Sequence, residues 1–127
     1  MADGFPPLLH ELEAEVMDEV WAERECSVRD VLDALNGRSK VARAYTTILT
    51  VMQRLHTKGL LRRERRGRRH VYVAALTRED YVAARAESQV EALVSQYGDA
   101  VLAEFSKRMS ALDPKRRLEI RRLASRG

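Results

Sequence analysis

The sequence predicts a mainly α-helical fold with one small β-hairpin, followed by a second group of helices. Two changes of period support this prediction. Up to residue 58, apolar side chains recur every three or four residues, as they do on one face of a helix. Between residues 60 and 74 the pattern alternates, as in strands, and from residue 77 the helical period returns.

The first 40 residues predict two helices. The first runs from about Leu8 to Glu23, with one acidic face and one apolar stripe. The second follows Ser27, because Asp30 three positions later can complete a capping box, and it is ended by Asn36-Gly37. The apolar stripes consist of Leu12, Val16, Met17, Val20 and Trp21 in the first helix, and Val28, Val31, Leu32 and Leu35 in the second.

A third helix is predicted from about Arg43 to Lys58, with Gly59 as its stop. Its inward stripe consists of Ile48, Val51, Met52 and Leu55. A rotation of about 100° per residue places hydrogen-bonding side chains on the opposite face, which is uncharged at its centre. That face consists of Arg43, Thr46, Thr50, Gln53 and Thr57, flanked by Thr47 and Arg54.

The stretch LLRRERRGRRHVYV, residues 60–73, predicts a β-hairpin. Its strands would run from about Leu60 to Arg65 and from Arg69 to Ala74, with Arg66-Gly67 at the tight turn. Val71 and Val73 would face one side, and His70 and Tyr72 the other. Three helices followed by a hairpin is the order of a winged helix-turn-helix. We therefore assign residues 1–76 to a winged helix DNA-binding domain, with arginines around the tip of its wing.

The net charge of +4 is unevenly distributed. Residues 1–40 carry four basic and ten acidic side chains, residues 41–73 carry nine and one, and residues 74–127 carry ten and eight. Such a local excess of positive charge is expected where a folded surface meets a polyanion. The third helix and the wing are therefore the predicted contact surface.

Double-stranded DNA is the partner that best fits this surface. A helix fits the major groove, where Thr46, Thr50 and Gln53 can read base edges while arginines at the margin hold phosphates. The wing would reach the neighbouring backbone or minor groove. The predicted arginine contacts are Arg43, Arg54, Arg66, Arg68 and Arg69.

Residues 77–127 predict a helical dimerisation region. Thr77 with Asp80 caps its first helix, Gly98-Asp99 interrupts it, and Asp113-Pro114 begins the last helix. The apolar stripes would pack on a second copy, which would place two recognition helices about 34 to 36 Å apart on DNA. Packing back on residues 1–76 is the alternative. The predicted dimer residues are Val90, Leu93, Val94, Tyr97, Val101, Leu102, Phe105 and Met109.

Other classes of function find little support. The only cysteine, Cys26, excludes an intramolecular disulfide and a multi-cysteine zinc site, and as a buried thiol it suits a reducing cytoplasm. We expect neither export nor membrane insertion, because no segment approaches about 20 apolar residues. We also expect no enzyme and no cofactor, because His10, His56 and His70 lie in separate elements. A histidine-based metal site stays open.

Three segments together resemble the penicillinase repressor family (BlaI/MecI type), across about Leu9 to Tyr81. They are VMDEVWAERECSVRDVLDALN, AYTTILTVMQRLHTKGLLRRERRGRRHVYV and LTREDY. Their shared features are a tryptophan that ends the first helix, a Tyr-Thr-Thr opening of the recognition helix, and a Gly-Arg turn in the wing. Copper-sensing relatives in this family would carry a cysteine cluster near the C-terminus, and this chain has none.

The resemblance implies a dimeric repressor that binds an inverted-repeat operator with the helix from Tyr45 to Arg54. It also implies release when a membrane sensor protease cuts the dimerisation region before a phenylalanine, commonly after an asparagine. The best match here is Glu104-Phe105, where glutamate replaces the asparagine.

Two rival classes remain open. A general RNA-binding or architectural protein could use the same basic hairpin, although it has less need of a dimer and of a threonine-rich helix face. An interaction module could use the C-terminal helices alone. Binding to a palindrome, to scrambled DNA and to RNA at several salt concentrations separates the three, because phosphate contact alone gives salt dependence without discrimination.

Overall fold

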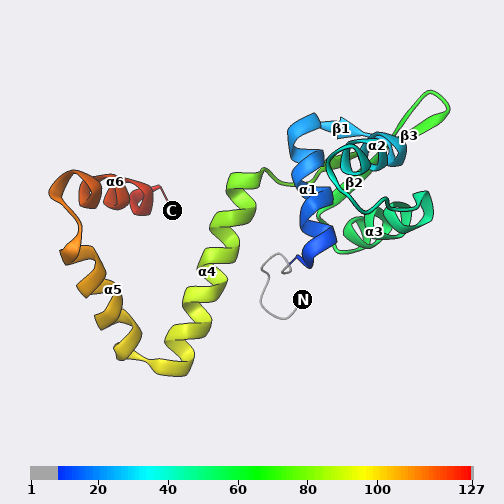
Figure 1. Cartoon of the computed structure of the whole chain (residues 1–127). Coiled ribbons are helices and arrows are strands. Elements are labelled where there is room, and N and C mark those ends of the chain that lie inside the picture. Colours follow the sequence, from blue (N-terminus) through cyan, green and yellow to red (C-terminus); the bar gives the residue numbers. More distant parts are fainter. Residues whose placement is uncertain (1–8, 127) are drawn as a thin grey trace. The chain divides into compact units, whose positions relative to one another are not determined.

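The computed structural model describes residues 9–126 and divides the chain into two compact units, Met1–Ala86 and Glu87–Gly127. The first unit contains three helices, a three-stranded antiparallel sheet and the beginning of α4 (Figure 1). The second contains the rest of α4, α5 and α6. The predicted functional domains are residues 1–76 and 77–127, so their boundary lies ten residues before the boundary of the two units. These functional domains stay a prediction.

Helix α1 spans Glu11–Glu23 and begins later than predicted. His10 has extended backbone at the N-cap, and its N–H donates to the Glu13 carboxylate at 3.0 Å. This hydrogen bond satisfies one of the free backbone groups at the helix start, so Leu9 and His10 stay outside the helix. The predicted start at Leu8 lies outside the described residues.

Helix α2 spans Val28–Arg38. The predicted capping box is confirmed, because the Ser27 hydroxyl accepts from the Asp30 N–H at 3.1 Å and the Asp30 carboxylate accepts from the Ser27 N–H at 2.9 Å. The predicted end at Asn36-Gly37 is wrong, since the helix continues through both residues. The Asn36 side chain instead bonds both backbone groups of Arg43, at 2.8 and 3.1 Å.

Helix α3 spans Tyr45–Thr57 and is shorter than the predicted Arg43–Lys58 at both ends. The bonds to Asn36 hold Arg43 in the loop before the helix, and Ala44 becomes the N-cap. At the other end, Gly59 adopts a φ of 83°, a left-handed conformation that stops the helix at low cost.

The sheet has the order β1-β3-β2 and contains one strand that the sequence pattern did not predict. Strand β1 is Glu25–Cys26, β2 is Leu61–Arg66 and β3 is Arg69–Ala74. Arg66 pairs with Arg69, so the turn is Gly67-Arg68 rather than Arg66-Gly67. Gly67 has a φ of 66°, as the first central position of a two-residue hairpin turn often requires.

One hydrophobic core joins the three helices to one face of the sheet. Tyr72, on that face, is 3% exposed, and its partner Cys26 is 1% exposed, which confirms the predicted buried thiol. Burial, together with neighbouring carboxylates led by Asp30, raises the pKa of the Cys26 thiol to about 12. The core side chains of α1, α2 and α3 are those of the predicted apolar stripes, with Leu12 and Trp21 partly buried at the edge.

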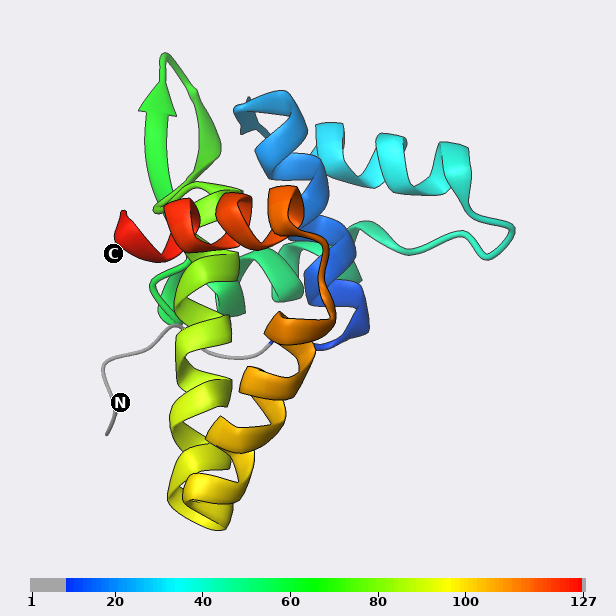
Figure 2. The same cartoon turned by 90° about the vertical axis from the view of Figure 1, so that its left-hand side faces the viewer.

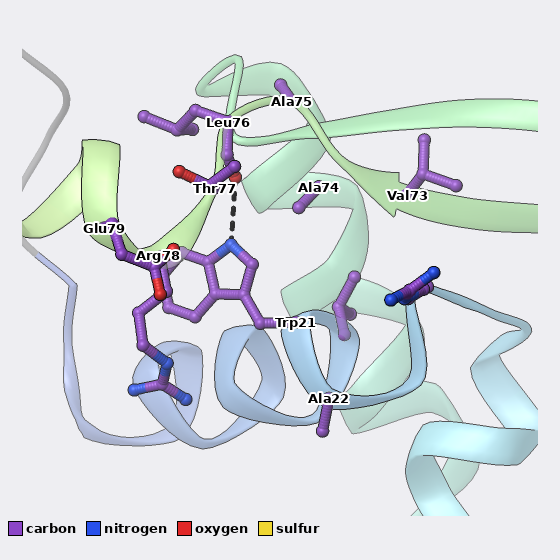
Figure 3. Close-up of a pocket in the computed structure, with 11 residues that line it drawn as sticks. Trp21, Ala22, Val73, Ala74, Ala75, Leu76, Thr77, Arg78 and Glu79 are labelled. Atoms are coloured by element: carbon purple, nitrogen blue, oxygen red, sulfur yellow. Dashed lines mark hydrogen bonds between the residues drawn. The ribbon is translucent and has the colours of Figure 1, made fainter.

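The beginning of α4 (Arg78–Tyr97) packs against α1. The Trp21 indole N–H donates to the Leu76 carbonyl at 2.9 Å (Figure 3). The centres of the Trp21 and Tyr81 rings lie 5.7 Å apart. The Arg78 guanidinium lies over the Trp21 ring and bonds Asp18 at 2.8 Å. The first turn of α4 is therefore part of the winged helix unit.

The second unit contains the C-terminal part of α4, α5 (Asp99–Ala111) and α6 (Pro114–Ser125). The predicted break at Gly98 and the predicted cap at Asp113 are confirmed: Gly98 has a φ of 63°, and the Asp113 carboxylate accepts from the Arg116 N–H at 2.9 Å. The Arg117 guanidinium donates to the Leu112 carbonyl at 2.8 Å. Within residues 87–126 no side chain is buried.

Candidate nucleic-acid interface

The outer face of α3 is open to solvent, as the helical period predicts. Ile48, Val51, Met52 and Leu55 are buried on its inner side. On the outer side Thr46, Thr47, Thr50, Gln53 and Arg54 are exposed, and Tyr45 at the helix start is 43% exposed. A shallow hollow of about 300 Å³ lies on this face between Thr50, Gln53, Arg54, Thr57 and Lys58. The helix therefore presents amide and hydroxyl groups without competing acidic side chains.

An ion pair fixes the C-terminal end of α3 to α1. The Lys58 ammonium lies 2.7 Å from the Glu13 carboxylate, which is 4% exposed. Burial opposes ionisation of Glu13, but the hydrogen bonds from Lys58 and from the His10 N–H outweigh it, and the pKa of Glu13 is lowered. Together with the bonds between Asn36 and Arg43, this pair holds both ends of the recognition helix.

The hairpin formed by β2 and β3 is drawn in green in Figure 2. Its two faces differ in the side chains that they carry. Strand alternation places Arg62, Glu64 and Arg66 on the face away from the core. There the Arg66 guanidinium lies 2.6 Å from Glu64 and 3.2 Å from Glu25, and Arg62 lies 3.7 Å from Glu64. This face is close to electrically neutral.

The other face carries Arg63, Arg65 and His70 beyond the buried Tyr72. In the described part of the chain, none of these three side chains, nor Arg68 at the turn, forms an ion pair with a carboxylate. The uncompensated positive charge of the wing therefore lies on this face and at its tip.

A groove of about 330 Å³ separates α3 from this face of the hairpin. Val28, Leu49 and Tyr72 supply its apolar lining. Its polar lining comes from α2, α3 and the hairpin. The polar residues are the N-cap Ser27 and Arg29 of α2, Tyr45 and Gln53 of α3, and Arg63, Arg69 and His70 of the hairpin. The Arg29 guanidinium lies 5.3 Å from the centre of the Tyr45 ring, so a cation of α2 lies beside the start of α3.

The predicted arginine contacts are not equivalent in the structure. Arg43 precedes α3 and lies 3.8 Å from Glu15, and Arg69 lies 3.4 Å from Asp30. Arg54 and Arg68 have no such partner among residues 9–126. Arg63 and Arg65 are not among the predicted contacts, although both lie on the same strand face as Tyr72. Counting alternate positions from Tyr72 selects both residues. All remain candidate contacts.

The predicted dimer residues of α4 and α5 are accessible in the second unit. Val90, Leu93, Leu102 and Phe105 are 37 to 50% exposed, Tyr97 is 57% exposed, and Val94, Val101 and Met109 are partly exposed. The two helices form an apolar hollow of about 340 Å³ lined by Leu93, Tyr97, Ala100, Val101, Glu104 and Phe105. Apolar side chains from both helices thus share one open surface.

Sites of another kind are weakly supported. A cavity of about 600 Å³ beside Trp21 is visible in Figure 3, but the indole N–H and the Arg78 guanidinium that line it are already bonded within the protein. Residues 9–126 contain no group of three or more histidine, cysteine, aspartate or glutamate side chains that could hold a metal ion. No helix in that range is long and apolar enough to cross a membrane.

Comparison with known proteins identifies the family of the chain. The sequence model of the penicillinase repressor family matches residues 9–126. The transcriptional regulator BlaI of Mycobacterium tuberculosis is 37% identical over 105 residues, which cover 81% of this chain and 75% of that protein. The match to the family model extends through the second unit.

Solved structures show the same fold for the first unit. The monomeric form of Bacillus licheniformis BlaI in complex with the blaP half-operator is 30% identical, with a TM-score of 0.51 over 60% of this chain and 90% of that one. A structure of the DNA-binding domain of the repressor BlaI matches with the same values. The winged helix fold is therefore confirmed, and the chain belongs to the penicillinase repressor family, whose members are transcriptional regulators rather than enzymes.

Proposed function

We propose that this chain is a transcriptional repressor that binds an inverted-repeat DNA operator sequence-specifically as a homodimer. The observation that carries the proposal is the outer face of α3. Its neutral Thr46, Thr50 and Gln53 are exposed, both helix ends are anchored, and a cationic wing lies beside it. Such a face offers hydrogen bonds to base edges while the arginines offer charge to phosphates.

The related BlaI of Bacillus licheniformis, solved in complex with a half-operator, supports the proposal. Its match covers 60% of this chain at 30% identity. We infer that the first unit of this chain binds one half-site in the same way.

The second unit supplies the proposed dimer contact. Residues 87–126 contain no buried side chain, so their apolar surface lacks a core of its own. Burying that surface against a second copy would stabilise both chains by about 25 cal/mol for each Å² removed from water. Two linked half-site contacts then bind far more tightly than one.

Release of the repressor by proteolysis is part of the proposal. Phe105 lies within α5, 38% exposed, on the apolar hollow that we assign to the dimer. A cut between Glu104 and Phe105 would divide α5 and remove part of that surface. A membrane sensor protease is the proposed agent, acting on a repressor in the cytoplasm.

Titration of the full chain with DNA tests the proposal. We expect an inverted repeat from the chain's own promoter to bind about 10³-fold or more tightly than a scrambled duplex. Both affinities should fall between about 50 and 200 mM salt, because counterions are released from phosphates. Equal affinity for the inverted repeat, scrambled DNA and RNA would instead support the architectural alternative, which relies on the basic hairpin alone.

A further inference from the structure

We propose that Arg63, Arg65 and His70 form a phosphate site for one operator strand on the side of the wing that faces α3. This inference rests on the proposed function. It assigns the DNA-backbone contact to one face of the hairpin.

The two faces of the hairpin differ in how their charges are compensated. On the outer face two arginines, Arg62 and Arg66, share Glu64 and Glu25. On the face toward α3, no carboxylate of the described residues bonds Arg63, Arg65 or His70. An anion from outside the chain therefore meets uncompensated charge on only one of the two faces.

The strand register brings the three side chains together. Arg65 is directly opposite His70, and Arg63 is opposite Tyr72, one step further along the same face. Directly opposite side chains start about 4.5 to 5.5 Å apart. A phosphate between Arg65 and His70 can therefore accept hydrogen bonds from both side chains.

The groove determines which anion fits. Arg63 and His70 line its hairpin side, while Tyr45 and Gln53 line its α3 side. A DNA strand whose bases are read by α3 must carry its phosphates past that helix, and the apolar lining between the two sides leaves room for the sugars. The fitting ligand is therefore a phosphodiester backbone, rather than a free nucleotide held in a closed pocket.

The other charged groups near His70 leave the site positive. From α2, Arg29 adds a cation whose guanidinium lies 4.0 Å from Asp33, and Asp30 adds an anion. The hydrogen bonds from Ser27 and the nearby Arg69 lower the pKa of Asp30. Asp30 is 3.4 Å from the Arg69 guanidinium, so its charge is already shared with that neighbour. From β1, Cys26 is a buried neutral thiol, and from α3, Tyr45 and Gln53 are uncharged.

Fluorescence anisotropy of labelled DNA with the full chain tests the inference. H70A should weaken operator binding, because one donor to the phosphate is lost. H56A, which changes another exposed histidine, should bind like the wild type. Scrambled DNA should show the same contrast between the two variants, because phosphates carry no sequence.

A second pair of variants tests the assignment of the hairpin face. R63Q should reduce the slope of log affinity against log salt by about 0.9 for each half-site, the value for one lost phosphate contact. R62Q, the same change on the neutral face, should leave the slope unchanged. Circular dichroism checks that each variant stays folded.

Different outcomes overturn the phosphate site and the proposed function. A wild-type chain that prefers the operator, with equal affinities for H70A and H56A, overturns the His70 contact and leaves the proposed function standing. Equal slopes for R63Q and R62Q overturn the assignment of the face. A wild-type chain without preference for the operator overturns the proposed function itself.

Discussion

Asn36 shows how one side chain determines where the recognition helix begins. Its amide bonds both backbone groups of Arg43, so the loop between α2 and α3 is closed by a residue inside α2. The local pattern Asn-Gly is typical of a helix end, which is why the sequence predicted a stop there. The deciding contact spans seven residues and is invisible to a rule that reads neighbouring positions.

At the residue scale, base readout by α3 is testable with Thr50 and Gln53. T50A or Q53A should weaken operator binding by about 1 to 3 kcal/mol while leaving scrambled DNA almost unaffected, because only contacts with base edges depend on sequence. Anisotropy titrations against both duplexes measure the difference. Equal losses on the two duplexes would show that these side chains contact the backbone only.

A second residue-scale prediction concerns the buried carboxylate of Glu13. Its pKa is lowered in the folded protein, so its contribution to stability is present above its ordinary value of 4.5 and is lost as the pH falls through the lower folded value. E13Q should lower the free energy of unfolding at pH 7 by about 1 to 3 kcal/mol, because Lys58 loses its partner.

The pH dependence of stability distinguishes the loss of the Glu13 charge from a loss of packing in E13Q. Between pH 7 and pH 3, urea unfolding of the wild type should show a larger loss of stability than that of E13Q. Parallel losses for both proteins would mean that Glu13 titrates alike in the folded and unfolded chain. E15Q, a change at a more exposed carboxylate of α1, is the matched control.

At the scale of elements, the helices were predictable from the sequence, whereas strand β1 and the position of the hairpin turn were not. The stripes of α1, α2 and α3 come from a local period that matches burial, so their core residues agree with the structure. Strand β1 has two residues, too few to show any period, and it exists because Cys26 pairs with Tyr72 far along the chain. The hairpin turn lies one residue later than predicted, because β2 begins at Leu61, which pairs with Ala74.

The candidate contacts of the wing were only partly predictable for the same reason. Six arginines in residues 60–73 signal a polyanion, but the sequence does not say which of them are paired with Glu25 or Asp30. That distinction needs the strand register and the position of α2. The pattern therefore predicted the surface, and the structure divides it into neutral and charged faces.

For the wing we predict a loss of affinity without a loss of specificity. R68Q, at the exposed turn, should weaken operator and scrambled DNA by the same factor and flatten the salt dependence by about 0.9 per half-site. Titrations at four salt concentrations measure the slope. A change in the preference between the two duplexes would place Arg68 on a base rather than on a phosphate.

At the scale of the whole molecule, dimerisation was inferred from surplus apolar stripes, and the structure of one chain leaves those stripes exposed. The division of the chain at Ala86 and Glu87 gives a better fragment boundary than Leu76, because Tyr81 packs on Trp21. A fragment of residues 1–86 should be a folded monomer whose operator affinity is lower by orders of magnitude. Sedimentation and anisotropy measure the two effects.

The proposed dimer surface makes a prediction for Phe105. F105A should raise the dissociation constant of the dimer, because it removes an aromatic side chain from the apolar hollow of α4 and α5. L123A, a change at a 60% exposed apolar residue of α6, is the control and should have a smaller effect. Light scattering over a concentration series gives both constants; an intact monomer at micromolar concentration in the wild type contradicts the assignment.

Proteolytic release has its own signature in cells. After induction, mass spectrometry should detect a fragment that ends at Glu104, and operator occupancy should fall at the same time. Full-length protein that persists while the target genes are expressed would exclude the cut and point to release by a ligand.

Native mass spectrometry of the full chain with a duplex that carries one inverted repeat tests whether the repressor binds as a dimer. We predict a complex of two chains on one duplex, formed far more readily than on a scrambled duplex, and a single chain on a half-site. One chain per inverted repeat, or the same complexes on the scrambled duplex, would contradict a sequence-specific dimeric repressor.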